Sequence, residues 1–386
     1  MAIHWLNKKK PQSKPYAKLK EEVKKKIQGN TGTFPKPPLT AHEISLIKQI
    51  KEETRRLNRN NVTRTKAYLD FYIQHPDIHW ALLGHLVSRN GGWQMTDLKG
   101  DLLPRLLTEK EQRYYYSFLE RGNWLIFQDV YPQLLLYREG VYSSRNYSYL
   151  LPFMNVSVFM ETIWNYFWKH GDRYLLAIAT IINEQSYLEK RIIQNDYFKK
   201  TVLNTLGFKL YDFLRFNHVI IPFYKNLKAK KPALLGDTLQ QFASLHHRIM
   251  LGKRLYSLLF HNEASLEGAL RWAIHHPHTG SRQDYWGHLF HSINETLPGT
   301  VYRPRTRKCR LKKGADRLYS PPLKYAWADT DHSETEKGDW LKDWRVVDYL
   351  IEEKYTDGGI YEEYCKTLEA IEHTIITKKA IFFRPE

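Results

Sequence analysis

The chain has 386 residues, is 42% hydrophobic and carries a formal net charge of +18 at pH 7. That length suffices for one large domain or two ordinary ones, and the 17 Phe, 26 Tyr and 11 Trp are ample material for a packed core. The longest useful apolar run, residues 174–182, is far below the roughly 18 residues that span a bilayer, and no apolar signal region opens the chain. These features exclude a helical membrane-spanning protein, and we expect a cytoplasmic one, with peripheral membrane association left open.

The positive charge is concentrated in two segments. Residues 1–66 hold 17 Lys and Arg against 5 Asp and Glu, and residues 302–325 hold nine against one. The remaining residues carry a net charge of −2. Such segments attract nucleic acid, anionic lipid or acidic proteins, whereas they say nothing about the fold.

In chain order, residues 1–38 come first and are predicted to be a basic, flexible arm, because they offer few apolar side chains to offset the entropy of ordering them. A short helix is possible over 16–27. From Thr40 the pattern changes: Thr40 and Glu43 have the spacing of a capping box, which predicts the start of a helix.

From there on, the sequence predicts a series of helices separated by glycine and proline residues. A helix over 65–74 ends before Pro76, and one over 76–88 closes at the glycine pair 91–92. A second capping box at Thr108–Glu111 opens a helix that is expected to stop at Gly122. The best alternating segment, 124–136, contains Pro132, which argues against a strand.

The C-terminal half continues the helical pattern. Further helices are predicted over 157–170, 172–193, 196–206, 238–260, 265–275, 281–293, 340–354 and 360–379, with a basic, extended segment at about 298–330. The predicted fold class is therefore all-α: a multi-helix globular body with few or no strands, in which residues 39–386 form a single domain.

Two groups of polar residues lie within apolar helices. Arg89 and Asn90 precede the glycine pair, where the end of a helix would favour a cation. These polar residues could form the wall of a cleft, but a hydrogen-bonded helix end is the favoured interpretation. Asn183 and Glu184 follow the apolar run, so Glu184 risks burial and a raised pKa unless it is paired. Glu161 on the preceding helix is placed to face it, although a structural ion pair with Arg191 or Arg173 is the favoured interpretation.

Histidines and cysteines give weaker signals. Asp284, His288 and His291 have the spacing of one helix face and are zinc-competent, but the motifs of zinc enzymes are missing, so surface or capping histidines are favoured and no metal or cofactor is predicted. Cys309 and Cys365 lie far apart in unlike contexts, and neither a disulfide framework nor a cysteine zinc site is predicted. Phosphate-loop, dinucleotide-binding and nucleophile-elbow motifs are also missing, which argues against nucleotide-driven and α/β-hydrolase chemistry.

The basic extended segment interleaves Arg, Lys and Tyr, which suits phosphate contacts with base stacking. Its candidate anion-binding residues are Arg303, Arg305, Arg307, Lys308, Arg310, Lys312, Lys313 and Arg317. The alternative is a strap whose cations pair with acidic helix faces of the body.

Several stretches, among them HWALLGHLVSRNGGWQMTDLKGDLL, ERGNWLIFQDVYPQLLLY and RLYSPPLKYAWAD, resemble the YppC-like family of uncharacterised proteins from spore-forming Gram-positive bacteria. The resemblance extends from about residue 40 to 380 and leaves the basic arm outside. It implies a cytoplasmic location and no assigned activity, so it transfers no catalytic residue.

Three functions remain open. The leading hypothesis is a helical binding protein that engages an anionic partner, nucleic acid first, through its basic segments. The second is an enzyme with a polar cleft around Arg89, Asn90, Glu161, Asn183, Glu184, Asp284 and His288. The third is peripheral membrane attachment through the basic, Trp-containing N-terminus.

Overall fold

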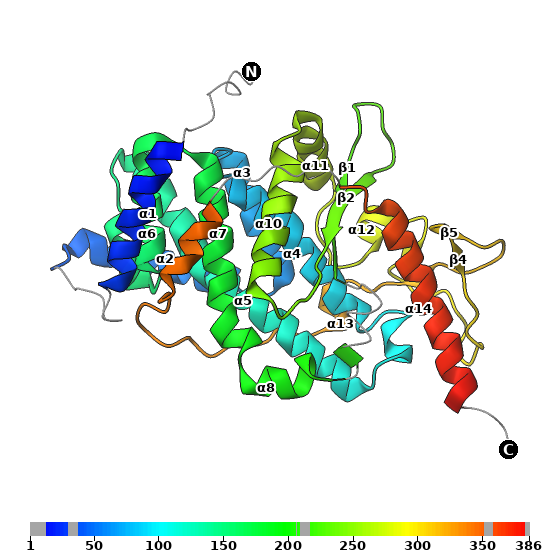
Figure 1. Ribbon diagram of the computed structural model, residues 1–386. Coiled ribbons are helices and arrows are strands. Elements are labelled where there is room, and N and C mark those ends of the chain that lie inside the picture. The colour runs from blue at the N-terminus through cyan, green and yellow to red at the C-terminus, as the bar shows by residue number, and fades with distance from the viewer. Residues whose placement is uncertain (1–12, 30–37, 206, 209–216, 351–357, 383–386) are drawn as a thin grey trace.

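The computed structural model describes residues 13–29, 38–205, 207–208, 217–350 and 358–382. It is mostly helical with a few short strands, as predicted. The long helices are α1 (Ser13–Gln28), α2 (Ala41–Leu57), α3 (Asn61–Gln74), α4 (His79–Asp97), α5 (Glu109–Ser143), α6 (Val158–His170), α7 (Arg173–Leu188), α10 (Leu245–Phe260), α11 (Glu263–His275) and α14 (Tyr361–Phe382). The N-terminal helices lie at one end of the body, and α14 lies with short strands at the other (Figure 1).

Short elements fill the C-terminal half. The strands are β1 (His218–Phe223), β2 (Ala233–Thr238), β3 (Phe290–His291), β4 (Thr306–Arg307), β5 (Arg310–Leu311) and β6 (Leu318–Tyr319). The short helices are α8 (Asp196–Phe198), α12 (Gln283–Trp286) and α13 (Leu323–Ala326); 3-10 turns lie at Leu103–Arg105, Ser148–Met154 and Trp344–Leu350, and π-helical turns at Glu189–Ile193 and Lys199–Leu203. β1 pairs with β2 and β4 with β5 in antiparallel fashion, whereas β3 and β6 are parallel.

Helix α7 is the central element of the body. Its residues from Leu175 to Asn183 are all buried, and it packs against α4, α5, α6 and α10. A helix that is apolar on every side is stable only when neighbours surround it, which accounts for the long apolar run in the sequence.

Both predicted capping boxes are present. The Thr40 hydroxyl accepts from the Glu43 amide at the start of α2, and Thr108 and Glu111 cap α5 in the same way. The predicted stop at Gly122 is wrong, because α5 continues through Gly122 and Pro132 to Ser143. Burial of the helix between Trp124 and Leu136 outweighs the propensity cost of these two residues, since packing rather than propensity supplies most helix stability.

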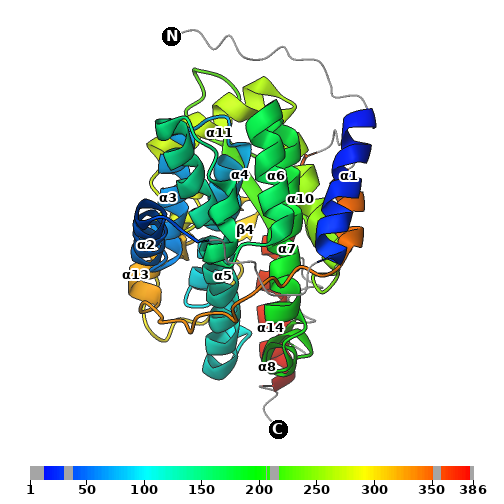
Figure 2. The same ribbon diagram turned by 90° about the vertical axis from the view of Figure 1, so that its left-hand side faces the viewer.

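The helix that the sequence leaves possible over 16–27 is present as α1. Its Leu19, Val23 and Ile27 are buried, and it packs on α6 and on the turn Trp344–Leu350 (Figure 2). The remainder of the basic arm, residues 1–12 and 30–37, lies outside the described residues.

The β1–β2 hairpin occupies residues for which the sequence predicts no strand. The helix expected from 238 begins instead at Leu245, because residues 233–238 form β2. Gly236 has φ +156°, and a Cβ there would lie 2.1 Å from the carbonyl oxygen of Val219 on β1. The close approach of the two strands therefore requires glycine at this position.

Candidate functional site

Arg89 lies in the middle of α4 with its side chain fully buried. Its Nη2 atom lies 3.8 Å from Oδ2 of Asp284, and its guanidinium carbon lies 4.2 Å from the centre of the Trp272 ring. Burial lowers the pKa of Arg89 to about 10, against the opposing effect of Asp284, so the side chain remains a cation at pH 7. The predicted place at a helix end is wrong, because α4 continues to Asp97.

His278 and Asn61 extend this buried cluster. Nδ1 of His278 lies 3.3 Å from Oδ2 of Asp284, and its Nε2 lies 2.8 Å from Oδ1 of Asn61. Asn61 donates to the backbone oxygen of Ser88 at 2.9 Å. The cluster thus joins α3 and α4 to the segment that precedes α12, and these contacts are those of a polar core.

Gly92 is a position in this core where an added side chain would clash with its neighbours. A Cβ at Gly92 would lie 2.3 Å from Nε2 of His278 and 2.4 Å from Oδ1 of Asn61, whereas a Cβ at Gly122 meets nothing within 4 Å. We expect Gly92→Ala to lower the free energy of unfolding by about 1–3 kcal/mol through overpacking. The matched change Gly122→Ala should raise it by about 0.5–1 kcal/mol, because alanine is the better helix former. Urea denaturation of both variants measures the difference; equal effects would contradict the assigned packing.

The shared helix face of Asp284, His288 and His291 does not form. Helix α12 ends at Trp286, and the chain then turns into β3. Asp284 points to the buried core, where it accepts from the Thr279 hydroxyl at 2.6 Å, while Nδ1 of His291 lies 3.3 Å from Glu295. The His288 side chain is largely exposed, and its partial burial lowers its pKa against the effect of a hydrogen bond with the backbone of Cys309. The prediction fails because a helix of four residues is too short to carry an i,i+4 pair.

Asn90 acts as a structural partner of β1. Its Nδ2 donates to the backbone oxygen of Ile220 and its Oδ1 accepts from the Ile220 amide, both at 2.9 Å. The side chain amide therefore imitates a neighbouring strand and fixes β1 on α4.

Asn183 lies in a second buried polar group, with Asp129 of α5. It donates to Oδ2 of Asp129 and accepts from the Ser157 hydroxyl at 2.8 Å. Burial raises the pKa of Asp129 to about 7, although the hydrogen bond from Asn183 acts against this shift. Asp129 lies in the alternating segment of the sequence, where nothing indicates its role.

Glu161 and Glu184 do not face each other. Glu161 lies on α6, where its nearest cation is Lys26 of α1 at 3.8 Å. No ion pair joins Glu184 to Arg191 or Arg173 in the described part of the chain, so the favoured interpretation of Glu184 is wrong. Burial raises the pKa of Glu184 to about 8, which confirms the expected effect of burial on this carboxyl.

Two predicted site residues, Asn90 and Glu184, line one cavity of about 210 Å³ between α4, α5, α7 and α10. Arg89, Glu161, Asn183, Asp284 and His288 do not line it. The structure therefore divides the predicted cleft into separate parts of the fold, because successive residues of a helix point to different neighbours.

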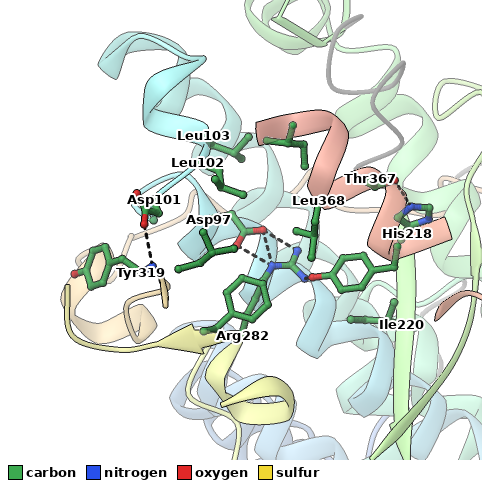
Figure 3. Close-up of a pocket in the computed structure, with 15 residues that line it drawn as sticks. Asp97, Asp101, Leu102, Leu103, His218, Ile220, Arg282, Tyr319, Thr367 and Leu368 are labelled. Atoms are coloured by element: carbon green, nitrogen blue, oxygen red, sulfur yellow. Dashed lines mark hydrogen bonds and ion pairs between the residues drawn. The ribbon is translucent and has the colours of Figure 1, made fainter. Parts of the chain in front are cut away.

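A further polar cluster, centred on Arg282, is not indicated by the sequence (Figure 3). Its guanidinium donates to both carboxylate oxygens of Asp97, with Nη2 at 2.7 Å from Oδ2, and to the hydroxyls of Tyr285 and Tyr364, each at 2.7 Å. The adjoining cavity holds about 30 Å³, room for a water molecule. Since Arg282 already uses its donors within the protein, this cluster connects α14 to α4 rather than binding a ligand. No local motif signals it, because its members are far apart in the chain.

The basic hairpin, residues 303–313, contains β4, β5 and a turn at Lys308 and Cys309, whose φ angles are +48° and +54°. Two predicted anion-binding residues are paired instead: Nη1 of Arg305 lies 2.7 Å from Asp101, and Arg317 pairs with Glu295. Arg305 and Arg317 therefore agree with the alternative interpretation, in which the basic segment is a strap whose cations pair with acidic residues of the body. The other six are exposed, namely Arg303, Arg307, Lys308, Arg310, Lys312 and Lys313.

Two connections fix the basic hairpin on α14. Cys309 and Cys365 form a disulfide, contrary to the prediction, which could not see that the fold brings these distant residues together. The buried Glu372 accepts from the Tyr302 hydroxyl at 2.7 Å and from the backbone amides of Arg305 and Thr306 at 2.6 and 2.9 Å. The hairpin is therefore held rigidly at its turn and at its base.

Exposed apolar side chains precede the basic hairpin in what we call the apolar loop, residues 293–301. Ile293, Leu297 and Val301 are 66%, 77% and 71% exposed. Their i,i+4 spacing is visible in the sequence, but it runs from the end of the predicted helix 281–293 into the predicted extended segment, so no single predicted element contains it. Among the described residues, no helix has the length and apolar character that crossing a membrane requires.

Comparison with known proteins agrees with the resemblance seen in the sequence. A family model described as "Protein of unknown function (DUF2515)" matches residues 56–362. A Bacillus subtilis (strain 168) protein, "Uncharacterized protein YppC", is 42% identical over 240 residues, which cover 62% of this chain and 72% of that protein. No solved structure matches this chain.

Proposed function

Since the chain belongs to the DUF2515 family, whose description assigns no activity, we propose a function from its own surface: it associates with an anionic membrane surface through the basic hairpin and the apolar loop. The observation that carries the proposal is that six exposed cations and three exposed apolar side chains follow one another closely along the chain, within residues 293–313.

The two kinds of side chain contribute differently to membrane binding. Each Lys or Arg near an anionic bilayer contributes about 1 kcal/mol, and apolar side chains that enter the interface add to this. A stable attachment needs two such signals. The rigid connection of the hairpin to α14 also supports the proposal, because less conformational entropy is lost when a preorganised surface binds.

Nucleic acid is the second candidate, and the structure favours it less. Sequence-tolerant binding of single strands combines phosphate contacts with bases stacked on exposed aromatic rings. In the segment proposed for stacking, Tyr325 is 74% exposed but lies beyond the basic hairpin, past β6. The tyrosine next to the hairpin, Tyr302, is buried and donates to Glu372. The hairpin can therefore contact phosphates, but the Tyr302 ring cannot stack on a base. Binding to nucleic acid also leaves the exposure of Leu297 and Val301 unexplained.

Co-sedimentation with vesicles tests the proposal. We expect the protein to pellet with vesicles of phosphatidylcholine and phosphatidylserine at 3:1, and to stay in the supernatant with pure phosphatidylcholine. Reversing three hairpin charges (Arg307→Glu, Lys308→Glu, Arg310→Glu) should weaken binding about a hundredfold. Leu297→Ser with Val301→Ser should weaken it further at high salt, where the electrostatic part is screened.

The β1–β2 loop offers a matched control. Lys225, Lys228 and Lys230 are exposed there, and their replacement by Glu changes the net charge by the same amount. This control should bind the anionic vesicles at least ten times more tightly than the hairpin variant. Equal losses in both variants would mean that only total charge matters, and retardation of DNA without binding to vesicles would favour nucleic acid; either result overturns the proposal.

A further inference from the structure

The cavity between α4, α5, α7 and α10 is large enough for a small organic molecule. Its volume of about 210 Å³ exceeds the ~150 Å³ of an engineered apolar cavity that binds benzene. Most of its wall is apolar; the side chains that form this part are Leu83, Val87, Leu119, Ile126, Ile181, Val219, Leu251 and Leu255.

The charged side chains at the wall are paired, except for Glu184. Nη2 of Arg64 lies 2.6 Å from Oε1 of Glu120, and Arg248 pairs with Glu189. Oε1 of Glu184 accepts from Nε2 of Gln185 at 3.3 Å, and the carboxyl also accepts from the Trp80 side chain. The cavity thus contains one carboxyl group with no ion-pair partner among the described residues.

We propose that this cavity binds a small, uncharged and largely apolar molecule, of the size of a substituted benzene, that accepts a hydrogen bond from the Glu184 carboxyl. The site is independent of the basic hairpin and of the function proposed for it, because the two share no residue.

The charge around the cavity selects this class of ligand. An anion would find both Arg64 and Arg248 already paired with carboxylates. A neutral acceptor matches a protonated carboxyl, because burial raises the pKa of Glu184 to about 8 against the hydrogen bonds from Gln185 and Trp80, and the nearby Asp129 adds to the rise. The pKa of Asp129 is itself raised to about 7, but Asp129 does not line the cavity, and the buried Tyr68 stays neutral, so Glu184 is the group at this wall that loses its proton above pH 7.

Calorimetric titration with acetophenone, which accepts but cannot donate a hydrogen bond, tests the proposal, with ethylbenzene and benzylamine as apolar and cationic comparisons. Acetophenone should bind at pH 6–7 and about thirtyfold more weakly at pH 9.5, where Glu184 has lost its proton. Ethylbenzene should bind with little dependence on pH. Glu184→Gln should bind acetophenone equally at both pH values, because its amide donates a hydrogen bond throughout.

Variants that fill the cavity complete the test. Val87→Phe places a ring in the cavity and should abolish binding of acetophenone and ethylbenzene, whereas Ile73→Phe changes an exposed position of α3 and should leave it intact. Circular dichroism melting establishes that each variant is folded. The proposal fails if the wild type binds none of the probes, if benzylamine binds more tightly than acetophenone at pH 7, or if Glu184→Gln retains the pH dependence.

Discussion

Replacing Glu120 with Gln is expected to lower the free energy of unfolding by about 3–5 kcal/mol at pH 7. Glu120 and Arg64 are each 1% exposed in their side chains, and they form a buried ion pair between α5 and α3. Burial alone would raise the pKa of Glu120. The interactions with Arg64 and His332 outweigh burial and hold this pKa below its ordinary value. Removing the negative charge leaves Arg64 as a buried cation whose acceptors are both neutral: the amide oxygen that the replacement introduces, and Oδ1 of Asn58 at 3.2 Å.

A matched control on the same helix separates burial from charge. Glu109 pairs with Arg113 at 3.7 Å, but both side chains are more than 60% exposed. Glu109→Gln should therefore change stability by less than about 1 kcal/mol. The double variant Arg64→Met with Glu120→Leu should be more stable than Glu120→Gln, because it leaves no charge unpaired. Chemical denaturation measures all three, and similar values for Glu120→Gln and Glu109→Gln would refute the role of the buried pair.

The second large effect concerns Asp129, whose replacement by Asn should stabilise the protein increasingly as the pH rises. Burial raises the pKa of Asp129 from 3.8 to about 7 in the folded protein. Between these values the folded state holds a proton that the unfolded state has released, so rising pH favours unfolding. The difference in unfolding free energy between Asp129→Asn and the wild type should grow by up to about 4 kcal/mol from pH 4 to pH 8, at 1.36 kcal/mol per pKa unit.

Buried groups that do not interact with Asp129 act on both proteins and cancel in this difference. One is His79: burial lowers its pKa to about 3, which destabilises the fold as the pH falls below the ordinary histidine range. Glu184 does not cancel fully, because Asp129 raises its pKa, so the replacement also removes part of the Glu184 effect, in the same direction. Asp70→Asn, an exposed position of α3, should reproduce the wild-type pH profile. Denaturation curves at each pH provide the comparison, and a parallel profile for Asp129→Asn would show that Asp129 is ionised in the folded state.

The features that the sequence predicted correctly depend on neighbouring residues. A capping box needs only Thr40 and Glu43, and the central helix is visible as an apolar run, so both could be located without the structure. The burial of Glu184 and the direction of its pKa shift follow from the same run. The predicted helix ends at Gly92 and Gly122 failed for the opposite reason: whether a glycine ends a helix or makes room for a neighbour depends on residues such as His278, far along the chain.

The candidate site shows the same division between local and distant contacts. Arg305 and Arg317 belong to the basic segment by composition, but Asp101 and Glu295 neutralise them. The sequence located the basic segment, whereas only the three-dimensional arrangement separates exposed cations from paired ones. The cavity beside Glu184 was not predictable at all, because an empty volume is a property of packing between four helices.

The disulfide between Cys309 and Cys365 makes a covalent ring of the residues between them, 56 positions apart in the sequence. The turn Trp344–Leu350, on which α1 packs, lies inside this ring. A single backbone cleavage within the ring would leave α14 attached to the rest of the chain through sulfur. A closed loop of chain therefore joins the two ends of the body. The N-terminal helix α1 packs against this loop at one end, and the basic hairpin forms part of the loop at the other.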